Sequence, residues 1–207
     1  MKDHLFARRK AGLALFLLLW LPAIAIAAGD VDAGRQKAVT CAACHGPDGN
    51  SANPEWPSLA GQHQKYIVKS LRDFKQGRRE NVLMSGQAMA LSEQDIEDLA
   101  AYFSAQPRKP GTADPALLTA GERLYRGGDI ERGISACIAC HGPHGSGNPA
   151  AAYPVLRGQH ATYTAAQLQL YRSGARASDP NQMMRNIAER LSDEDIQAVA
   201  SYIQGLR

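Results

Sequence analysis

Two short segments of this chain, CAACH at 41–45 and CIACH at 137–141, share the pattern Cys-x-x-Cys-His. The sequence around them repeats too, since WPSLAGQHQKY from Trp56 returns as YPVLRGQHATY from Tyr153, and LSEQDIEDLAAYF from Leu91 returns as LSDEDIQAVASYI from Leu191. The period of the repeat is that of a whole small domain and not of a solenoid unit. The sequence therefore predicts two tandem copies of one domain.

The boundaries of the two domains follow from the composition of the segments that flank them. Residues 1–28 are typical of a secretory signal peptide, with a basic start, an apolar run and small residues at Ala25 and Ala27. An uncleaved membrane anchor is the alternative, because the apolar run is almost long enough to span a bilayer. Both interpretations send the rest of the chain out of the cytoplasm. We expect a first domain at 29–106, a Pro-rich linker at 107–114 and a second domain at 115–207.

Apolar residues recur at helical spacing in both copies, and nothing alternates like a β-strand. Two helices are predicted in each copy, around Ile67 to Phe74 and Ile96 to Phe103, and again around Ala165 to Tyr171 and Ile196 to Ile203. Ser92 with Asp95 and Ser192 with Asp195 have capping-box spacing. A third helix is expected before each cysteine motif, at 32–39 and 115–125. The predicted fold class is all-α, with long loops after each cysteine motif.

The charge balance argues against one class of partner. The whole chain carries a formal charge of +3, but residues 1–27 hold four of its basic side chains and one of its acidic ones, which leaves 19 of each. A neutral mature chain gives no support for nucleic-acid binding, which needs a basic patch or stripe.

The four cysteines admit several chemistries. Zinc would need four ligands in one place, whereas the two pairs lie in separate copies. A redox-active dithiol of the thioredoxin type expects a βαβ context that is absent from this pattern. Disulfides are compatible with export, but they leave His45 and His141 unexplained.

Covalent haem attachment accounts for every residue of the motif. In C-x-x-C-H, two thiols bond to the porphyrin and the following histidine reaches the iron. Cys41 and Cys44, and likewise Cys137 and Cys140, are then the attachment residues, with His45 and His141 as proximal iron ligands. A buried haem would also supply core volume to a domain of this size, which is marginal by itself. Two haem c groups are therefore predicted, one in each copy.

The other face of each iron needs a ligand, and methionine is the candidate that the repeat favours. Met84 lies seven residues before Leu91, and Met184 lies seven before Leu191. Met89 and Met183 have no methionine at their equivalent positions. Met84 and Met184 are the predicted axial ligands, and Met183 is the alternative to Met184. Each could instead be a gap-filling residue.

Several residues near the motifs are candidates for contacts around the haem. Pro57 and Pro154 recur after the motif, where a backbone carbonyl can accept the N–H of the proximal imidazole or simply form a rigid turn. His63 and His160 recur in GQH, and we expect them to cap the following helix, with a haem propionate or the facing domain as alternatives. Four further side chains are propionate candidates: Tyr66, Tyr163, Arg78 and Arg176.

The sequence closely resembles the cytochrome c4 family, exported bacterial cytochromes with two class I cytochrome c domains. The resemblance covers nearly all of 29–207, through both CxxCH motifs, GPDGN, both GQH segments, LYRGGDIERGISAC and the closing SYIQGLR. It implies one covalent haem per domain, His/Met ligation, electron transfer in the periplasm and association with the membrane surface. Implied partners are a quinol-oxidising complex and a terminal oxidase or reductase.

Two other functions are compatible with part of this pattern. A dihaem peroxidase also has two CxxCH motifs, but it needs one iron that opens to substrate, whereas both copies here offer a matched methionine. A cytochrome subunit of a larger dehydrogenase or oxidase is the other. We expect an electron carrier and no enzymatic activity.

Overall fold

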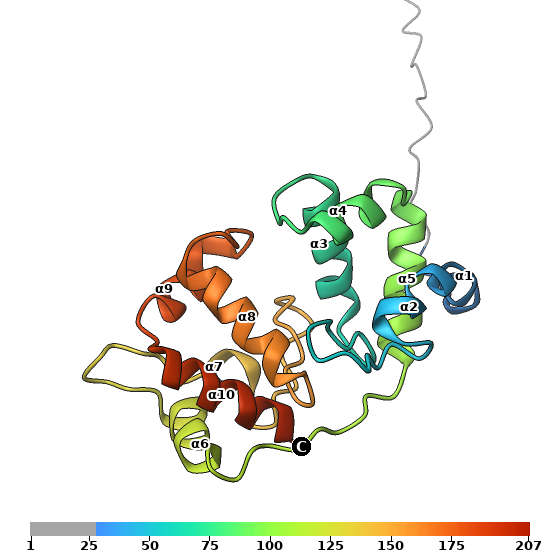
Figure 1. The fold of residues 1–207 in the computed structure, drawn as a ribbon. Helices are drawn as coiled ribbons and strands as arrows, with labels where there is room; N and C mark the ends of the chain where they lie inside the picture. Colours follow the sequence, from blue (N-terminus) through green and yellow to red (C-terminus); the bar gives the residue numbers. More distant parts are fainter. Residues whose placement is uncertain (1–27) are drawn as a thin grey trace, which may run out of the picture.

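The computed structural model describes residues 28–207, and the predicted signal peptide lies almost wholly outside that range. Figure 1 shows two helical bodies side by side, joined by an extended segment at 106–114 that runs below them. Within the described residues, no helix is long and apolar enough to cross a membrane. Two isolated bridges, Asp129 with Ile134 and Asn148 with Tyr153, are the β-type pairings of this part of the chain. The prediction of an all-α fold with two tandem domains is confirmed.

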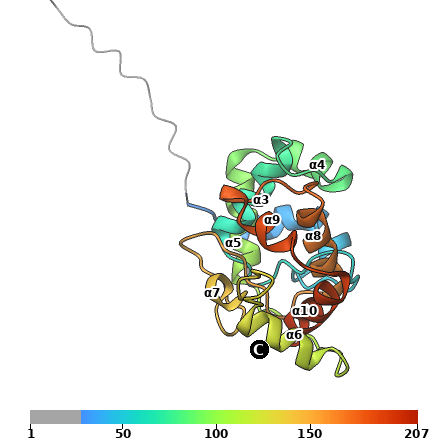
Figure 2. The same cartoon turned by 90° about the vertical axis from the view of Figure 1, so that its left-hand side faces the viewer.

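Each domain has the same order of helices. The first contains α1 Val31–Lys37, a 3₁₀ turn at Ala38–Thr40, α2 Ala42–His45, α3 Gln64–Lys75, α4 Val82–Met89 and α5 Glu93–Ala105. The second contains α6 Leu118–Gly127, α7 Ile138–His141, α8 Ala161–Arg172, a 3₁₀ turn at Pro180–Gln182, α9 Met183–Ala188 and α10 Asp193–Gly205. Figure 2, seen from the side of the second domain, places α8 and α9 in front of the first domain.

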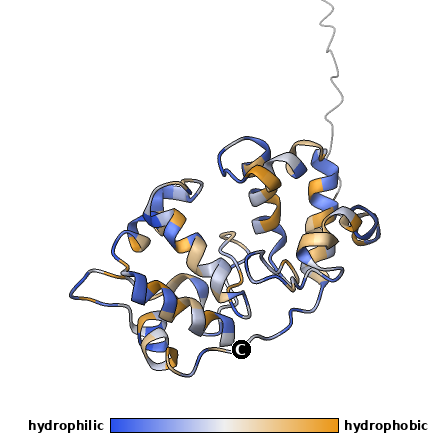
Figure 3. Ribbon diagram, in the orientation of Figure 1, coloured by the Kyte–Doolittle hydropathy of each residue, from blue (hydrophilic) through white to orange (hydrophobic). Residues whose placement is uncertain are grey.

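Two separate hydrophobic cores hold these helices, one in each domain. The first is built around Ile96 and Leu99 of α5, and the second around Ile196 and Val199 of α10. These four side chains are at most 2% exposed. Figure 3 shows apolar stretches on the long helices and mostly hydrophilic loops at the outer edges.

The first helix of each domain crosses the last one at a glycine. A Cβ atom at Gly34 of α1 would collide with the backbone carbonyl of Asp98 on α5. Gly121 of α6 is in the same position against Ala198 on α10. Only glycine permits this approach, so the duplicated glycines fix how the terminal helices pack.

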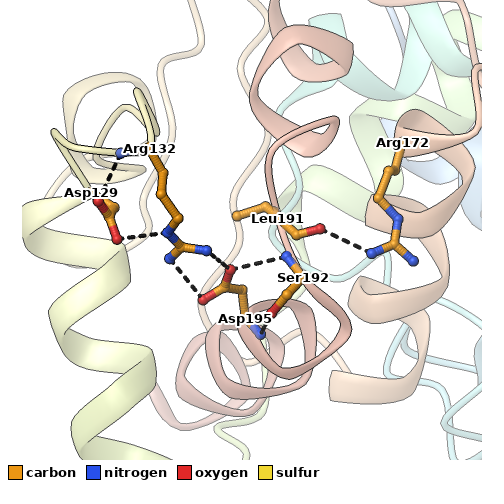
Figure 4. Close-up of polar contacts among 6 residues, drawn as sticks. All are labelled: Asp129, Arg132, Arg172, Leu191, Ser192 and Asp195. Atoms are coloured by element: carbon orange, nitrogen blue, oxygen red, sulfur yellow. Dashed lines mark hydrogen bonds and ion pairs between the residues drawn. The ribbon is translucent and has the colours of Figure 1, made fainter.

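The predicted capping boxes are present at the start of both last helices. Ser92 and Asp95 exchange side-chain and backbone hydrogen bonds at α5, and Ser192 and Asp195 do so at α10. At α10 the box is reinforced, because Arg132 pairs with Asp195 at 2.5 Å and with Asp129 at 2.8 Å (Figure 4). Arg172 of α8 donates to the carbonyl of Leu191 just before the box, at 2.9 Å. The chain leaving α9 is therefore held from two sides.

Two short helices that the sequence did not predict hold the methionines. Met84 lies inside α4, and Met184 lies in the first turn of α9. Both helices are short and carry no long apolar stripe, so hydrophobic periodicity gave no signal for them. The second begins after Asn181 and Gln182, both with positive φ.

Candidate haem-binding site

One cavity, of about 920 Å³, runs between the helices of both domains. Its walls include every predicted attachment residue and iron ligand: Cys41, Cys44, His45, Met84, Cys137, Cys140, His141 and Met184. Residues that are about 100 positions apart in the sequence thus face one shared space. The two predicted haem sites are neighbours and not remote pockets.

Each cysteine pair is presented by a single helical turn. Cys41 is the N-cap of α2 and Cys44 lies within it, while Cys137 and Cys140 hold the same positions at α7. All four cysteines are free, and no group of three or more His, Cys, Asp or Glu side chains in residues 28–207 could hold a metal ion. This arrangement presents two thiols side by side in each domain, as two thioether bonds to one haem require.

Both histidines end their turns and are held by a proline carbonyl. His45 Nδ1 lies 2.9 Å from the carbonyl oxygen of Pro57, and His141 Nδ1 lies 3.0 Å from that of Pro154. A carbonyl only accepts, so Nδ1 carries the proton in both rings. The hydrogen bond expected from the repeated prolines is present in both domains.

The protonation state of these rings suits iron. His45 and His141 are only 6% and 7% exposed, and burial lowers the pKa of each ring despite the opposing proline carbonyl. The rings are therefore neutral at pH 7. With Nδ1 protonated, Nε2 keeps its lone pair and is the atom that can bind a metal.

Three methionines are available as the second axial ligands, and two of them occupy equivalent positions in the repeat. Met84, Met183 and Met184 all line the cavity, whereas Met89 is 68% exposed and does not. The sulfur of Met183 accepts a hydrogen bond from the Tyr153 hydroxyl at 3.6 Å. The side chain of Met184 packs against the second core. The assignment of Met84 and Met184 as axial ligands stays a prediction.

Two buried arginines meet at the domain boundary inside the cavity. Arg79 donates to the hydroxyl of Tyr163 at 2.9 Å, and Arg176 donates to the hydroxyl of Tyr66 at 3.1 Å. Gln167 accepts from both arginines. Each arginine thus reaches into the other domain.

These arginines carry positive charge that the described residues do not balance. Arg79 and Arg176 are 8% and 7% exposed, and neither pairs with a carboxylate of residues 28–207. Nε of Arg176 is buried without a hydrogen-bond partner. Burial opposes ionisation of the Tyr66 phenol, yet Arg176 and Arg79 outweigh it and lower its pKa. Such sites favour anions, and the propionates of a haem are suitable ones.

The prediction that Arg78 contacts a haem propionate was wrong by one residue, because Arg79 is the arginine that lines the cavity. Its side chain is 55% exposed and pairs with Asp73 at 2.8 Å, away from the domain boundary. Arg79, the next residue, is the structural counterpart of Arg176. The repeat itself contained the signal, since the offset of 97 that aligns the two GQH segments places Arg79, and not Arg78, at the position of Arg176.

The GQH segments connect the domains and do not cap helices. His63 Nε2 lies 2.8 Å from the carbonyl oxygen of Ser146, and His160 Nε2 lies 2.8 Å from that of Ser51. Neither histidine forms a side-chain cap at α3 or α8. The expected capping role was wrong, and the alternative of contact with the facing domain is the one observed.

The glutamines of GQH cross the boundary too, and sequence reasoning missed them. Gln62 bonds both the N–H and the carbonyl of Val155, at 2.8 and 3.0 Å. Gln159 bonds both backbone groups of Ser58, at 2.9 and 3.0 Å. The repeat of GQH was the signal, but it did not show that the partner lies in the other domain.

The residues of the cavity fit haem c. Paired free thiols, a neutral histidine, methionine sulfurs and unpaired buried arginines occur in duplicate around one largely apolar space. Bound haem would be held by Cys41, Cys44 and His45 in the first domain and by Cys137, Cys140 and His141 in the second. The haem iron supplies one-electron redox chemistry, and the protein supplies ligands, burial and charge.

Comparison with known proteins gives a consistent result. Residues 31–106 and 118–207 match the family described as cytochrome c. Cytochrome c4 of Azotobacter vinelandii is 51% identical over 207 residues, covering 95% of this chain and 99% of that protein. The crystal structure of reduced recombinant cytochrome c4 from Pseudomonas stutzeri is similar with a TM-score of 0.85 at 48% identity, covering 87% of this chain and 100% of the other. The thiosulfate dehydrogenase electron acceptor of Stutzerimonas stutzeri strain A1501 is 43% identical, covering 80% of this chain and 78% of that protein.

Proposed function

Because this chain belongs to the cytochrome c4 family of dihaem electron-transfer proteins, we propose that it shuttles electrons in the periplasm, from a quinol-oxidising complex to a terminal oxidase or reductase. Each iron would take up one electron as it passes from the ferric to the ferrous state and release it to the acceptor. The finished molecule would thus carry up to two electrons.

One observation carries the proposal: both copies bring a cysteine pair, a histidine and a methionine to the same cavity. A carrier works with both axial positions filled, since substrate need not reach the iron. A peroxidase-like enzyme would need one open position, and the matched sets of ligands argue against it. The shared cavity also favours electron exchange between the two haems.

The chemistry of the ligands suits a carrier in a respiratory chain. A methionine sulfur favours the ferrous state more than a second histidine would, and so raises the reduction potential. The neutral, carbonyl-bonded histidine opposes this by raising ligand basicity. The reduction potential of each haem therefore depends on the balance of these two effects.

The location rests on the N-terminal segment. Its basic start, apolar run and terminal alanines are those of an exported protein. Covalent attachment of haem c through C-x-x-C-H is consistent with export. Peripheral association with the membrane would place the carrier near both of its proposed partners.

A second candidate partner comes from one relative. The Stutzerimonas protein that is 43% identical bears the name of an electron acceptor of thiosulfate dehydrogenase. We therefore also consider a role as the electron-accepting cytochrome of a periplasmic dehydrogenase. In that case the donor would be a dehydrogenase such as thiosulfate dehydrogenase, and not a quinol-oxidising complex.

Stopped-flow measurements on the mature holoprotein test both donors. The ferric protein is mixed with a purified quinol-oxidising complex and quinol, or with thiosulfate dehydrogenase and thiosulfate, and its haem absorbance is followed. Fast reduction by the first, followed by reoxidation with a terminal oxidase, supports the shuttle. Fast reduction by the dehydrogenase alone supports the second role. A high-spin haem that turns over peroxide would contradict both.

A further inference from the structure

The glutamine of each GQH segment touches the loop that holds the proximal histidine of the other domain. Gln159, in the second domain, accepts a hydrogen bond from the Ser58 N–H at 2.9 Å. Ser58 directly follows Pro57, whose carbonyl binds His45 of the first domain. The pattern is reciprocal, because Gln62 of the first domain accepts from the Val155 N–H, and Val155 directly follows Pro154.

One peptide group lies at the centre of each chain of contacts. The carbonyl of Pro57 and the N–H of Ser58 belong to the same planar amide, whose electrons are delocalised. At one end the amide accepts from His45 Nδ1, and at the other it donates to Gln159 Oε1. The amide of Pro154 and Val155 has the same position between His141 and Gln62.

From this arrangement we infer that Gln159 tunes the haem of the first domain and Gln62 tunes the haem of the second, each acting across the domain boundary through one peptide group. These glutamines are positioning residues that polarise the carbonyl acceptor of the proximal histidine. This role rests on one part of the proposed function, namely that His45 and His141 bind the haem irons.

The direction of the effect follows from hydrogen-bond cooperativity. An acceptor on the amide N–H makes the carbonyl at the other end of that amide a stronger acceptor. A stronger acceptor on Nδ1–H raises the basicity of the imidazole and so stabilises the ferric iron. Each glutamine therefore lowers the reduction potential of the haem in the opposite domain.

The relay, meaning the path from each glutamine through one peptide group to the histidine, is shielded from water. Gln62, Gln159, Ser58 and Val155 are between 4% and 6% exposed, so water does not compete for these hydrogen bonds. Each glutamine also donates through Nε2 to the carbonyl of the residue it contacts, at 3.0 Å in both domains. The two bonds hold the side-chain amide in one orientation, with Oε1 on the N–H.

The test measures the potential of each haem separately in the holoprotein, by a redox titration that follows the haem methyl resonances in NMR spectra. Replacement Gln62→Leu is expected to raise the potential of the second haem and leave that of the first unchanged. Gln159→Leu is expected to do the reverse. Each change should reduce the ferric-to-ferrous ratio of the affected haem about twofold at a fixed applied potential.

A matched control separates the relay from a general loosening of the domains. His63→Ala removes the bond to Ser146 across the same boundary but leaves Gln62 and Val155 intact. It should shift neither potential. The hyperfine-shifted ring protons of His141 should move in Gln62→Leu and stay unchanged in His63→Ala.

Should Gln62→Leu fail to fold, Gln62→Met removes the same acceptor from the Val155 N–H with an unbranched side chain of similar length. The potential of the second haem should again rise, and that of the first should stay unchanged. The inference is overturned if the variant that folds shifts the first haem, shifts both equally, shifts neither or lowers the second potential. If the proposed electron donor or acceptor is wrong, each glutamine variant should still shift the potential of the haem in the opposite domain. If the glutamines do not act on the haems, the proposed electron transfer between donor and acceptor is unaffected.

Discussion

The carboxylate of Asp179 accepts a hydrogen bond from the backbone N–H of Met184 at 3.0 Å. The side-chain oxygen of Asn81 does the same for Met84, also at 3.0 Å. The two methionines therefore share a local anchor as well as a position in the repeat. Met183 lacks this anchor and has Tyr153 as its partner. This relationship favours Met184 over its neighbour as the ligand of the second iron.

Replacement Met184→Ala should therefore lower the potential of the second haem and open its iron. Loss of the sulfur ligand disfavours the ferrous state, and the vacant position admits carbon monoxide. The absorption spectrum with and without carbon monoxide, together with a redox titration, measures both effects. The first haem should keep its low-spin spectrum.

Met183→Ala is the matched control, because it removes a neighbouring methionine that also lines the cavity. It should leave the second haem low-spin and closed to carbon monoxide. If it opens the iron and Met184→Ala does not, the assignment is one residue off.

The buried arginines at the domain boundary lead to a second prediction. Arg176→Gln removes a positive charge from the cavity that both haem sites share. The ferric haem carries one more positive charge than the ferrous haem, so loss of the guanidinium favours the ferric state. Redox titration should show lower potentials, with the larger shift in the haem whose propionates Arg176 binds.

Arg78→Gln removes the same charge from an exposed neighbouring position and serves as the control. Solvent screens that charge, so little change is expected. An equal shift in the two variants would show that the buried arginines have no special relation to the haems.

The duplicated features of this chain were the ones that the sequence predicted well. Comparison of the copies paired the cysteine motifs, the capping boxes and the prolines that bind the histidines, since each depends on residues close together in one domain. Local chemistry of this kind repeats whenever the sequence repeats.

Contacts between the domains could not be predicted in the same way. Nothing in the GQH segment shows that Gln62 reaches Val155, because that bond depends on how the two copies pack. For Arg79 the repeat gives the equivalence with Arg176, but nothing in the sequence shows that its side chain reaches Tyr163 of the other domain. A repeat identifies equivalent positions but gives no information on the surface between them.

A third prediction concerns acid stability at the start of α10 (Figure 4). The hydrogen bonds from Arg132 lower the pKa of Asp195, against the opposing effect of burial. Because the folded chain holds this carboxylate ionised more strongly than the unfolded chain, the stability it provides is present above about pH 4. That stability is lost as the pH falls through the lowered pKa of the folded state.

Asp195→Asn should therefore lower the free energy of unfolding by about 1 kcal/mol at pH 7. The difference from the unsubstituted protein should shrink towards zero as the pH falls below about 3. Urea denaturation at several pH values, followed by haem absorbance, measures it. Glu194→Gln, at an exposed position of the same helical turn, should change stability much less. A constant difference across this pH range would exclude ionisation of Asp195 as the cause.

The last prediction tests the covalent haems themselves. Replacement of both Cys41 and Cys44 by Ala should leave a mature protein with one haem, because the two thioether links of the first domain can no longer form. Mass measurement on the denatured protein reports the number of attached haems. The first domain should also become more exposed to hydrogen exchange, since a domain of about 80 residues that lacks its haem buries too little surface to be stable. The reciprocal pair, Cys137→Ala with Cys140→Ala, should remove the other haem and expose the second domain instead. Retention of two covalent haems in either variant would show that these cysteines are not the attachment sites.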